Sequence, residues 1–344
     1  MLKKILLASA LCVCLVGADF AGQPLFERWR PLMGTSFGVR VFESDLSAED
    51  LARTVDQALD LVASLEEKMS SYKEGSLIGR INRAKAGETF DLDDDTYQVM
   101  REALRVSRLS GGAFDVTVWP LKKLWKRAKQ TREPPTPEEI NSALRDVGYQ
   151  YILLDSFGKK LSLKKEGVQI DLGGIAKGYA VQEAARFLKN HGVRSAIVDG
   201  RSSVSFVGRP TGAPHWRVGI EHPRKPDTYA AVLELPEPMA VSTSGDYEDF
   251  FLHDGKRYSH IFDPHTGASP PSRVVSVTVV SENATLADGL DTAFFVLGSE
   301  KGFKMLEALG DESVQAVCIE EDVRGRLTLS TSGKIQSYLQ EINL

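Results

Sequence analysis

The chain has 344 residues, 42% of them hydrophobic, and a formal net charge of −5. This composition is that of a soluble globular protein, and it excludes a disordered, collagen-like or disulfide-stapled chain. Because 47 acidic side chains outnumber 42 basic ones, the chain lacks the basic surplus of a nucleic-acid-binding protein. No nucleic acid is therefore expected as its main partner.

The first 18 residues have the pattern of a signal peptide. Two lysines precede an apolar stretch at residues 5–16, and small residues follow where a signal peptidase would cut. The stretch is too short for a stable membrane span. We expect residues 1–18 to be removed from a protein exported to the periplasm or cell envelope. One alternative is an inner-membrane lipoprotein anchored through Cys12 or Cys14, and only then is membrane association expected. A buried N-terminal helix is the other.

Residues 19–30 are expected to form an N-terminal extension and residues 31–340 one domain, since no Pro-, Gly- or Ser-rich linker divides them. Apolar residues at helical spacing, with capping signals, predict helices at 47–65, 94–109, from Thr136 onward, 175–190 and 286–296. Alternating or continuous apolar runs predict strands at 36–42, 195–198, 204–207, 216–221, 230–235 and 274–280, with hairpins turning at 157–158 and 254–255. Helices and strands come in blocks, which favours an α+β fold: a single compact mixed-sheet domain with one or two lobes.

The segment at residues 169–179 combines an acid, two glycines and a lysine. An apolar strand is predicted to deliver Asp171, after which Gly173 and Gly174 precede a helix. Glycines let a ligand approach the backbone, a helix N-terminus favours an anion, and Lys177 adds a charge suited to phosphate. The segment lacks the spacing of a P-loop or a dinucleotide fingerprint, and tight strand–helix packing is the alternative explanation.

A second segment places oxygen ligands on one helix face. Asp288, Asp291 and Thr292 stand at positions i, i+3 and i+4 of the predicted helix. Two carboxylates and a hydroxyl suit a hard ion, Mg²⁺ first. The alternative is an acidic first turn that complements the helix dipole.

Two further segments carry polar and aromatic residues. Residues 242–247 and 258–267 combine hydroxyls, glycines and histidines, as a phosphate- or sugar-binding loop does. A serine hydrolase is disfavoured because no GxSxG elbow surrounds any serine, and no HExxH pair points to zinc. Residues 111–120 place an aromatic ring and an acid after two glycines, which suits contact with an adenine or isoalloxazine ring. A helix end followed by a strand explains them equally well.

Taken in this order, these segments resemble the ApbE family of FAD:protein FMN transferases. The resemblance spans residues 30 to 300 and rests on segments that are weak singly and specific as a series. They are residues 33–35, 70–72 with Ser76 and Asn82, 112–117, 171–178, 243–247, 258–267 and 287–292.

The resemblance implies a cleft for a flavin nucleotide and a transfer reaction. With Mg²⁺, the family moves FMN from FAD onto a threonine or serine hydroxyl of an acceptor protein and releases AMP. The acceptors are subunits of membrane redox pumps and other exported flavoproteins. The resemblance makes His260 the candidate catalytic base. It implies FAD contacts from Met33, Tyr72, Ala113, Phe114, Asp115, Asp171, Lys177 and Ile261, and an ion held by Asp288, Asp291, Thr292 and a main-chain carbonyl near Gly174.

One position departs from the family's pattern. After the strand at 195–198 the family usually has a glycine pair, whereas this chain has Arg201 after Gly200. Such a change is expected to narrow the pocket, add a phosphate contact or alter acceptor choice. Two alternatives to flavin transfer stay open, and this departure motivates the second of them. In one, water is the acceptor and FAD is hydrolysed to FMN and AMP. In the other, the protein binds flavin without catalysis.

Overall fold

The structure is a computed structural model, and it describes residues 23–236, 238–270 and 272–344. The signal peptide expected at residues 1–18 lies outside the described residues. Within the described part of the chain, no helix is both long and apolar enough to cross a membrane.

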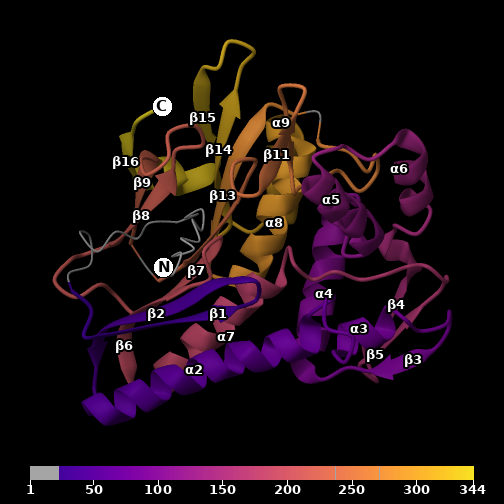
Figure 1. Ribbon diagram of the computed structural model, residues 1–344. Coiled ribbons are helices and arrows are strands. Elements are labelled where there is room, and N and C mark those ends of the chain that lie inside the picture. Colours follow the sequence, from indigo (N-terminus) through magenta and orange to yellow (C-terminus); the bar gives the residue numbers. More distant parts are fainter. Residues whose placement is uncertain (1–22, 237, 271) are drawn as a thin grey trace, which may run out of the picture.

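The centre of the molecule is an eight-stranded sheet in the order β1-β2-β6-β7-β10-β13-β14-β15 (Figure 1). All its neighbouring strands pair antiparallel. The bounds are β1 Phe26–Leu32, β2 Thr35–Ser44, β6 Val193–Asp199, β7 Ser203–Val207, β10 Ala240–Gly245, β13 Val274–Ser281, β14 Gln315–Glu321 and β15 Leu327–Thr331. All eight residues of β13 are buried, because other elements cover both faces of the sheet.

Helices cover one face of the sheet, and a small sheet covers the other. The helical layer contains α2 (Ala48–Met69), α7 (Ala176–Asn190) and α8 (Ala284–Leu297), with α4 (Asp94–Leu109) and α9 (Ser299–Leu309) beside them. The opposite face packs against β8 (Trp216–Glu221) and β9 (Tyr229–Leu235), which pair in the order β16-β9-β8 with β16 (Leu339–Ile342). Successive residues of β13 show the alternation: Val279 faces the helical core, and Val280 faces the core under β8 and β9.

A second group of elements extends the helical layer to one side (Figure 1). It contains α3 (Leu77–Ile81), α5 (Trp119–Thr131), α6 (Pro137–Leu144) and a three-stranded sheet of β3 (Thr89–Asp91), β5 (Lys160–Leu163) and β4 (Ile152–Asp155). The hairpin of β11 (Phe250–His253) and β12 (Lys256–Ser259) packs on α5. Two 3₁₀ turns span Tyr149–Tyr151 and Gly333–Tyr338.

The local signals in the sequence explain most element ends. Ser47 caps α2 by accepting the N–H of Asp50, and Thr136 forms a full capping box with Glu139 at the start of α6. The turn at residues 254–255 has two residues of positive φ, as a type I′ turn requires. The α+β prediction is thus confirmed for the described residues.

The structure also corrects the sequence analysis. Strand β1 begins at Phe26, inside the expected N-terminal extension, and pairs along its whole length with β2. Residues 119–131 form α5, whereas a strand after residue 112 was the predicted alternative to a ligand contact there. The helix starts without a side-chain cap, so its start is marked only by the proline in its first turn. Helix α9 and strands β14, β15 and β16 were not predicted.

Candidate active site

A cavity of about 1180 Å³ brings the predicted site residues together. It lies where several connections meet: the β1–β2 turn, the α2–α3 connection, the loops before α5 and α7, the segment after β12, and the face of α8. Of the predicted residues, those that line it are Met33, Tyr72, Ala113, Phe114, Asp115, Asp171, Gly174, Lys177, His260, Ile261, Asp288 and Thr292. Asp291 does not line it and is buried beside Thr292.

Asp288 and Asp291 form a buried acidic pair on α8. The Oδ2 atom of Asp288 accepts the backbone N–H of Gly178 at 2.8 Å. The Oδ1 atom of Asp291 accepts the hydroxyls of Ser244 at 3.0 Å and Thr292 at 3.1 Å, whereas its buried Oδ2 has no hydrogen-bond partner among the described residues. Burial raises the pKa of both carboxyl groups, and the nearby Asp288 raises the pKa of Asp291 further. The positive charge of Lys177 acts against this shift at Asp288, but burial outweighs it.

These residues fit a hard divalent cation. Two carboxylates and the Thr292 hydroxyl offer oxygen ligands, and Asp291 Oδ2 has spare capacity as an acceptor. Gly174 lies beside them, since a Cβ built on it would be 3.7 Å from the Thr292 hydroxyl oxygen. In residues 23–236, 238–270 and 272–344, no group of three or more His, Cys, Asp or Glu side chains is arranged to hold a metal. A cation on α8 would thus depend on hydroxyl and main-chain oxygens as well as the two acids.

Close approach of two helices positions Asp288. A Cβ on Gly178 would collide with the carbonyl oxygen of Ala284 and lie 2.6 Å from the Cβ of Asp288. Only glycine lets the backbone of α7 approach α8 so closely that its N–H reaches the carboxylate. The glycine-rich segment noted in the sequence therefore serves the acidic pair as well as the cavity wall.

His260 is held as a neutral base that faces the cavity. Its ring Nδ1 lies 3.3 Å from the carbonyl oxygen of Asp249, so Nδ1 carries the proton and Nε2 is left as an acceptor. The ring is open to the cavity, whose walls limit its hydration. This desolvation, reinforced by Lys177 and Lys122 against the opposing effect of Asp249, holds the pKa of His260 below its usual range.

Asp171 is engaged by two neighbours that the sequence analysis did not pair with it. Its Oδ1 accepts the hydroxyl of Ser71 at 2.6 Å, and its Oδ2 accepts Lys122 Nζ at 2.6 Å. Burial alone would lower the pKa of Lys122, but the charge and hydrogen bond of Asp171, together with Tyr72 and Asp249, outweigh it and raise the pKa. Lys122 is therefore a charged cavity residue that was missed, because α5 was not predicted. Lys177 lies within 3.4 Å of the carbonyl oxygen of Gly173.

Asp115 holds a loop in place. Its Oδ1 accepts the N–H and hydroxyl of Thr117 at 2.8 and 2.6 Å, and its Oδ2 accepts the N–H of Tyr149 at 2.7 Å. Both oxygens are thus used inside the protein, although the residue lines the cavity. Its carboxylate fixes the loop that presents Ala113 and Phe114 to the cavity.

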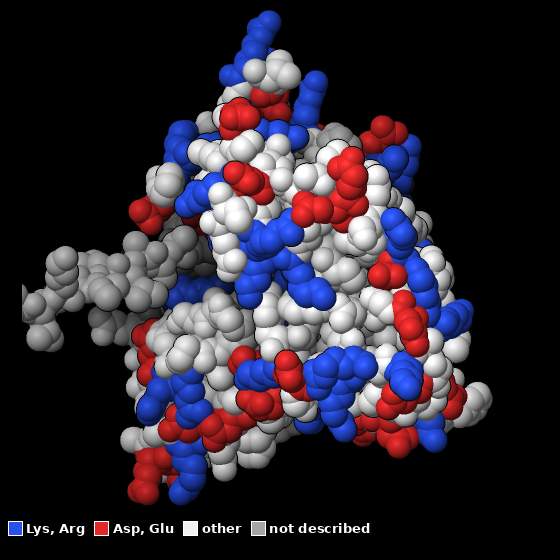
Figure 2. Space-filling view, turned by 45° about the vertical axis from the view of Figure 1, so that its right-hand side comes forward, with Lys and Arg blue, Asp and Glu red and all other residues white. Residues whose placement is uncertain are grey.

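An aromatic and cationic wall faces the cavity from the α5 side. The ring of Tyr72 is 54% exposed and packs edge-to-face on Trp119 at 4.7 Å, while Lys126 Nζ lies 4.4 Å from its centroid. Figure 2 shows Lys and Arg side chains gathered near the middle of the face on this side of the molecule. An exposed ring beside cations suits a planar ligand that carries phosphate.

The β1–β2 turn closes the cavity from the sheet side. Met33 and Gly34 both have positive φ in this two-residue turn, and the N–H of Met33 donates to Glu66 Oε2 at 2.7 Å. The turn is thus anchored to α2. A non-glycine residue at φ 53° is uncommon, so the backbone here is specified by the hairpin.

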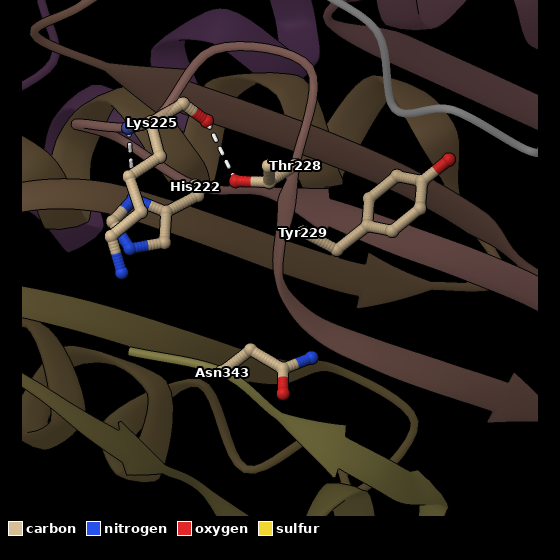
Figure 3. A pocket seen from close by; sticks show the side chains of 5 residues that line it. All are labelled: His222, Lys225, Thr228, Tyr229 and Asn343. Carbon is tan, nitrogen blue, oxygen red and sulfur yellow. Dashed lines mark hydrogen bonds between the residues drawn. The ribbon is translucent and has the colours of Figure 1, made fainter.

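A second pocket, of about 370 Å³, lies between the β8–β9 connection and the last residues of the chain (Figure 3). There His222 Nδ1 accepts the backbone N–H groups of Arg224 and Lys225, each at 3.1 Å. The turn built in this way presents Arg224, whose guanidinium binds Asp246 through two bonds of 2.7 and 2.8 Å and also contacts Glu321. This pocket belongs to a turn that supports the end of β10.

Known proteins are similar to this chain in both sequence and fold. The model of the ApbE family matches residues 33–318. An FAD:protein FMN transferase of Vibrio cholerae is 34% identical over 281 residues, covering 81% of this chain and 83% of that protein. One of Treponema pallidum is 30% identical and covers 90% and 89%.

Solved structures agree with this. The flavin transferase ApbE from Vibrio cholerae superposes with a TM-score of 0.79 at 31% identity, covering 91% of this chain and 98% of that one. The ApbE protein from Thermotoga maritima gives 0.80 at 32% identity, covering 92% and 99%. Sequence and fold agree over nearly the whole length of each protein, and the chain belongs to the ApbE family.

Proposed function

We propose that this chain is an FAD:protein FMN transferase that moves FMN from FAD onto a threonine or serine hydroxyl of an exported flavoprotein and releases AMP. One observation carries the proposal: His260 and Asp288 line a single cavity, and Asp291, whose Oδ2 accepts no hydrogen bond from the described residues, is buried directly beside Thr292 of the same wall. The relatives named FAD:protein FMN transferase support it.

The reaction makes one phosphorus–oxygen bond and breaks another. The acceptor hydroxyl oxygen attacks the FMN phosphorus, the bond to the bridging oxygen breaks, and AMP leaves with that oxygen. The hydroxyl proton passes to Nε2 of His260, which the Asp249 carbonyl leaves free to accept it. Mg²⁺ held by Asp288, Asp291 and Thr292 would neutralise charge that develops on the phosphoryl oxygens.

Other residues bind and orient the nucleotide. Lys177 and Lys122 provide positive charge on the cavity wall, and Asp171 fixes the position of the Lys122 ammonium. The exposed ring of Tyr72 offers a stacking surface, and the loop held by Asp115 presents Phe114. These contacts hold FAD so that one phosphorus lies between the acidic pair and His260.

The decisive experiment uses purified protein, FAD, Mg²⁺ and a panel of exported flavoproteins as acceptors. In-gel flavin fluorescence and a mass increase of one FMN on an acceptor threonine are expected, and EDTA abolishes both. Changing that threonine to valine is the matched control. Free FMN and AMP without an acceptor would instead identify a hydrolase, and tight FAD binding without turnover a non-catalytic flavin-binding protein.

We also propose that the protein acts outside the cytoplasm. The basic and apolar pattern of residues 1–18 supports this, and so do the exported acceptors of the resembling family. Fractionation of cells that express the full chain tests it, and the expected result is a periplasmic or envelope signal. Incorporation of labelled palmitate at Cys12 or Cys14 would identify the lipoprotein form.

A further inference from the structure

Arg201 has a backbone conformation that residues with side chains seldom adopt. It lies between β6 and β7 with φ 73°, in the left-handed region. Its N–H donates to Oδ1 of Asp199 at 2.8 Å, and Asp199 is almost fully buried. This contact fixes the turn. A glycine would adopt the turn without strain, so the arginine side chain needs its own explanation.

The side chain of Arg201 packs over Trp29 of a neighbouring strand. The guanidinium carbon lies 4.7 Å from the ring centroid of Trp29 on β1, and both residues line the cavity. Nearby Arg30 pairs with two carboxylates, and Arg40 lies 3.6 Å from Asp199. Among the described residues, none accepts a hydrogen bond from the Arg201 guanidinium or forms a salt bridge with it.

The Arg201 turn belongs to the cavity wall that carries the acidic pair. The carbonyl oxygen of Ser202 accepts the N–H of Thr243 at 2.8 Å and the hydroxyl of Ser242 at 3.3 Å. The hydroxyl of Ser242 also reaches Oδ1 of Asp288 at 3.4 Å. The residue after Arg201 is thus connected to Asp288 through Ser242, and Arg201 belongs to different elements from the cavity wall around Tyr72.

We propose that Arg201 binds a carboxylate of the acceptor protein close to the hydroxyl that receives FMN. This inference rests on the proposed transferase function. A guanidinium packed over an indole presents a planar fork that matches a carboxylate through two hydrogen bonds. In the proposed reaction the FAD phosphates are bound by Lys177 and by the cation at Asp288, which line another part of the cavity. Strand β1 is an edge of the large sheet, so an approaching protein chain reaches Trp29 and Arg201 from that edge.

The test compares Arg201→Gly, which removes the side chain and suits the positive φ, with Arg201→Lys, which keeps the charge without the fork. Quenching of flavin fluorescence gives the Kd for FAD without an acceptor, and transfer at saturating FAD gives the KM for an acceptor that the wild-type enzyme flavinylates. We expect the Kd for FAD to change less than about twofold. The acceptor KM should rise about 10-fold or more in Arg201→Gly, and less in Arg201→Lys.

Acceptor variants locate the partner carboxylate. Each Asp or Glu near the target threonine is changed to Asn or Gln, and one of these changes should raise the KM of the wild-type enzyme without raising that of Arg201→Gly further. Weaker FAD binding with unchanged acceptor KM would overturn the inference by assigning the guanidinium to the nucleotide. If Arg201→Gly leaves the acceptor KM unchanged and only raises the Tm, the side chain affects stability alone, and the inference is overturned. If the wild-type enzyme flavinylates no acceptor, the transferase function fails, and this inference fails with it.

Discussion

Removing one charge from the acidic pair should stabilise the metal-free protein. Asp288 and Asp291 stand three residues apart on α8, which places their Cβ atoms about 5–6 Å apart. At an effective dielectric constant of about 20, two negative charges at that separation repel by about 3 kcal/mol. Asp291→Asn removes this repulsion, but its amide places an N–H group where Oδ2 has no partner, which costs about 1 kcal/mol. The net gain is about 2 kcal/mol.

Magnesium should reverse this order of stability. At about 100 times its Kd, a ligand stabilises the folded protein by about 2.7 kcal/mol, and only the wild-type site keeps both carboxylates. Thermal unfolding in EDTA should place Asp291→Asn about 4 °C above wild type. Saturating Mg²⁺ should raise the Tm of wild type alone. Asp254→Asn, on the exposed β11–β12 turn, is the matched control and should follow wild type. A variant that unfolds below wild type in EDTA and gains equally from Mg²⁺ would refute the assignment of the pair.

Three further outcomes follow from single residues. The lowered pKa of His260 keeps its ring neutral as the pH falls below about 6.5, so kcat/KM with Mg²⁺ saturating should hold at pH 5.5; an acid limb centred near pH 6.5 would contradict this. Arg224→Leu leaves Asp246 and Glu321 without their shared cation, and urea unfolding should show a loss of about 2–3 kcal/mol, whereas an unchanged midpoint would count against the ion pair. Burial raises the pKa of the Cys318 thiol to about 12, so a thiol reagent should label it only after unfolding, and labelling of the folded protein would disprove its burial.

The sequence predicted those parts of the fold whose signals are local. Capping residues such as Thr136 fixed helix starts, and the Asp-Gly pair at residues 254–255 fixed a hairpin, because these signals act within a few residues. Helix α5 was missed because it starts without a side-chain cap, although Leu121, Trp125 and Ala128 keep the spacing of a buried helix face. The order of strands in the large sheet is set by contacts between residues far apart in the chain, which periodicity does not encode.

At the candidate site, the sequence indicated which residues take part better than it indicated which of them contact one another. The spacing of Asp288, Asp291 and Thr292 on one helix was sufficient to place them together. That Lys122 binds Asp171 was not visible, since the two residues are 49 positions apart and one of them lies on the missed helix. The sequence also marked Arg201 only as a departure from a pattern, whereas the structure supplies its left-handed backbone and its contact with Trp29.

The acidic pair explains why fold and site are inseparable in this protein. Two buried carboxylates raise the free energy of the metal-free state. Other contacts of the fold must therefore hold them in place against their repulsion and desolvation. The backbone N–H of Gly178 and the hydroxyl of Ser244 provide such contacts from α7 and β10, on either side of α8. Because α7 and β10 are themselves fixed by the central sheet and its helical layer, the pair cannot separate without loss of core packing. The same contacts leave Asp291 Oδ2 without a hydrogen-bond partner among the described residues. A bound cation would relieve the unfavourable free energy of the buried pair, and this relief would add to the affinity for the cation.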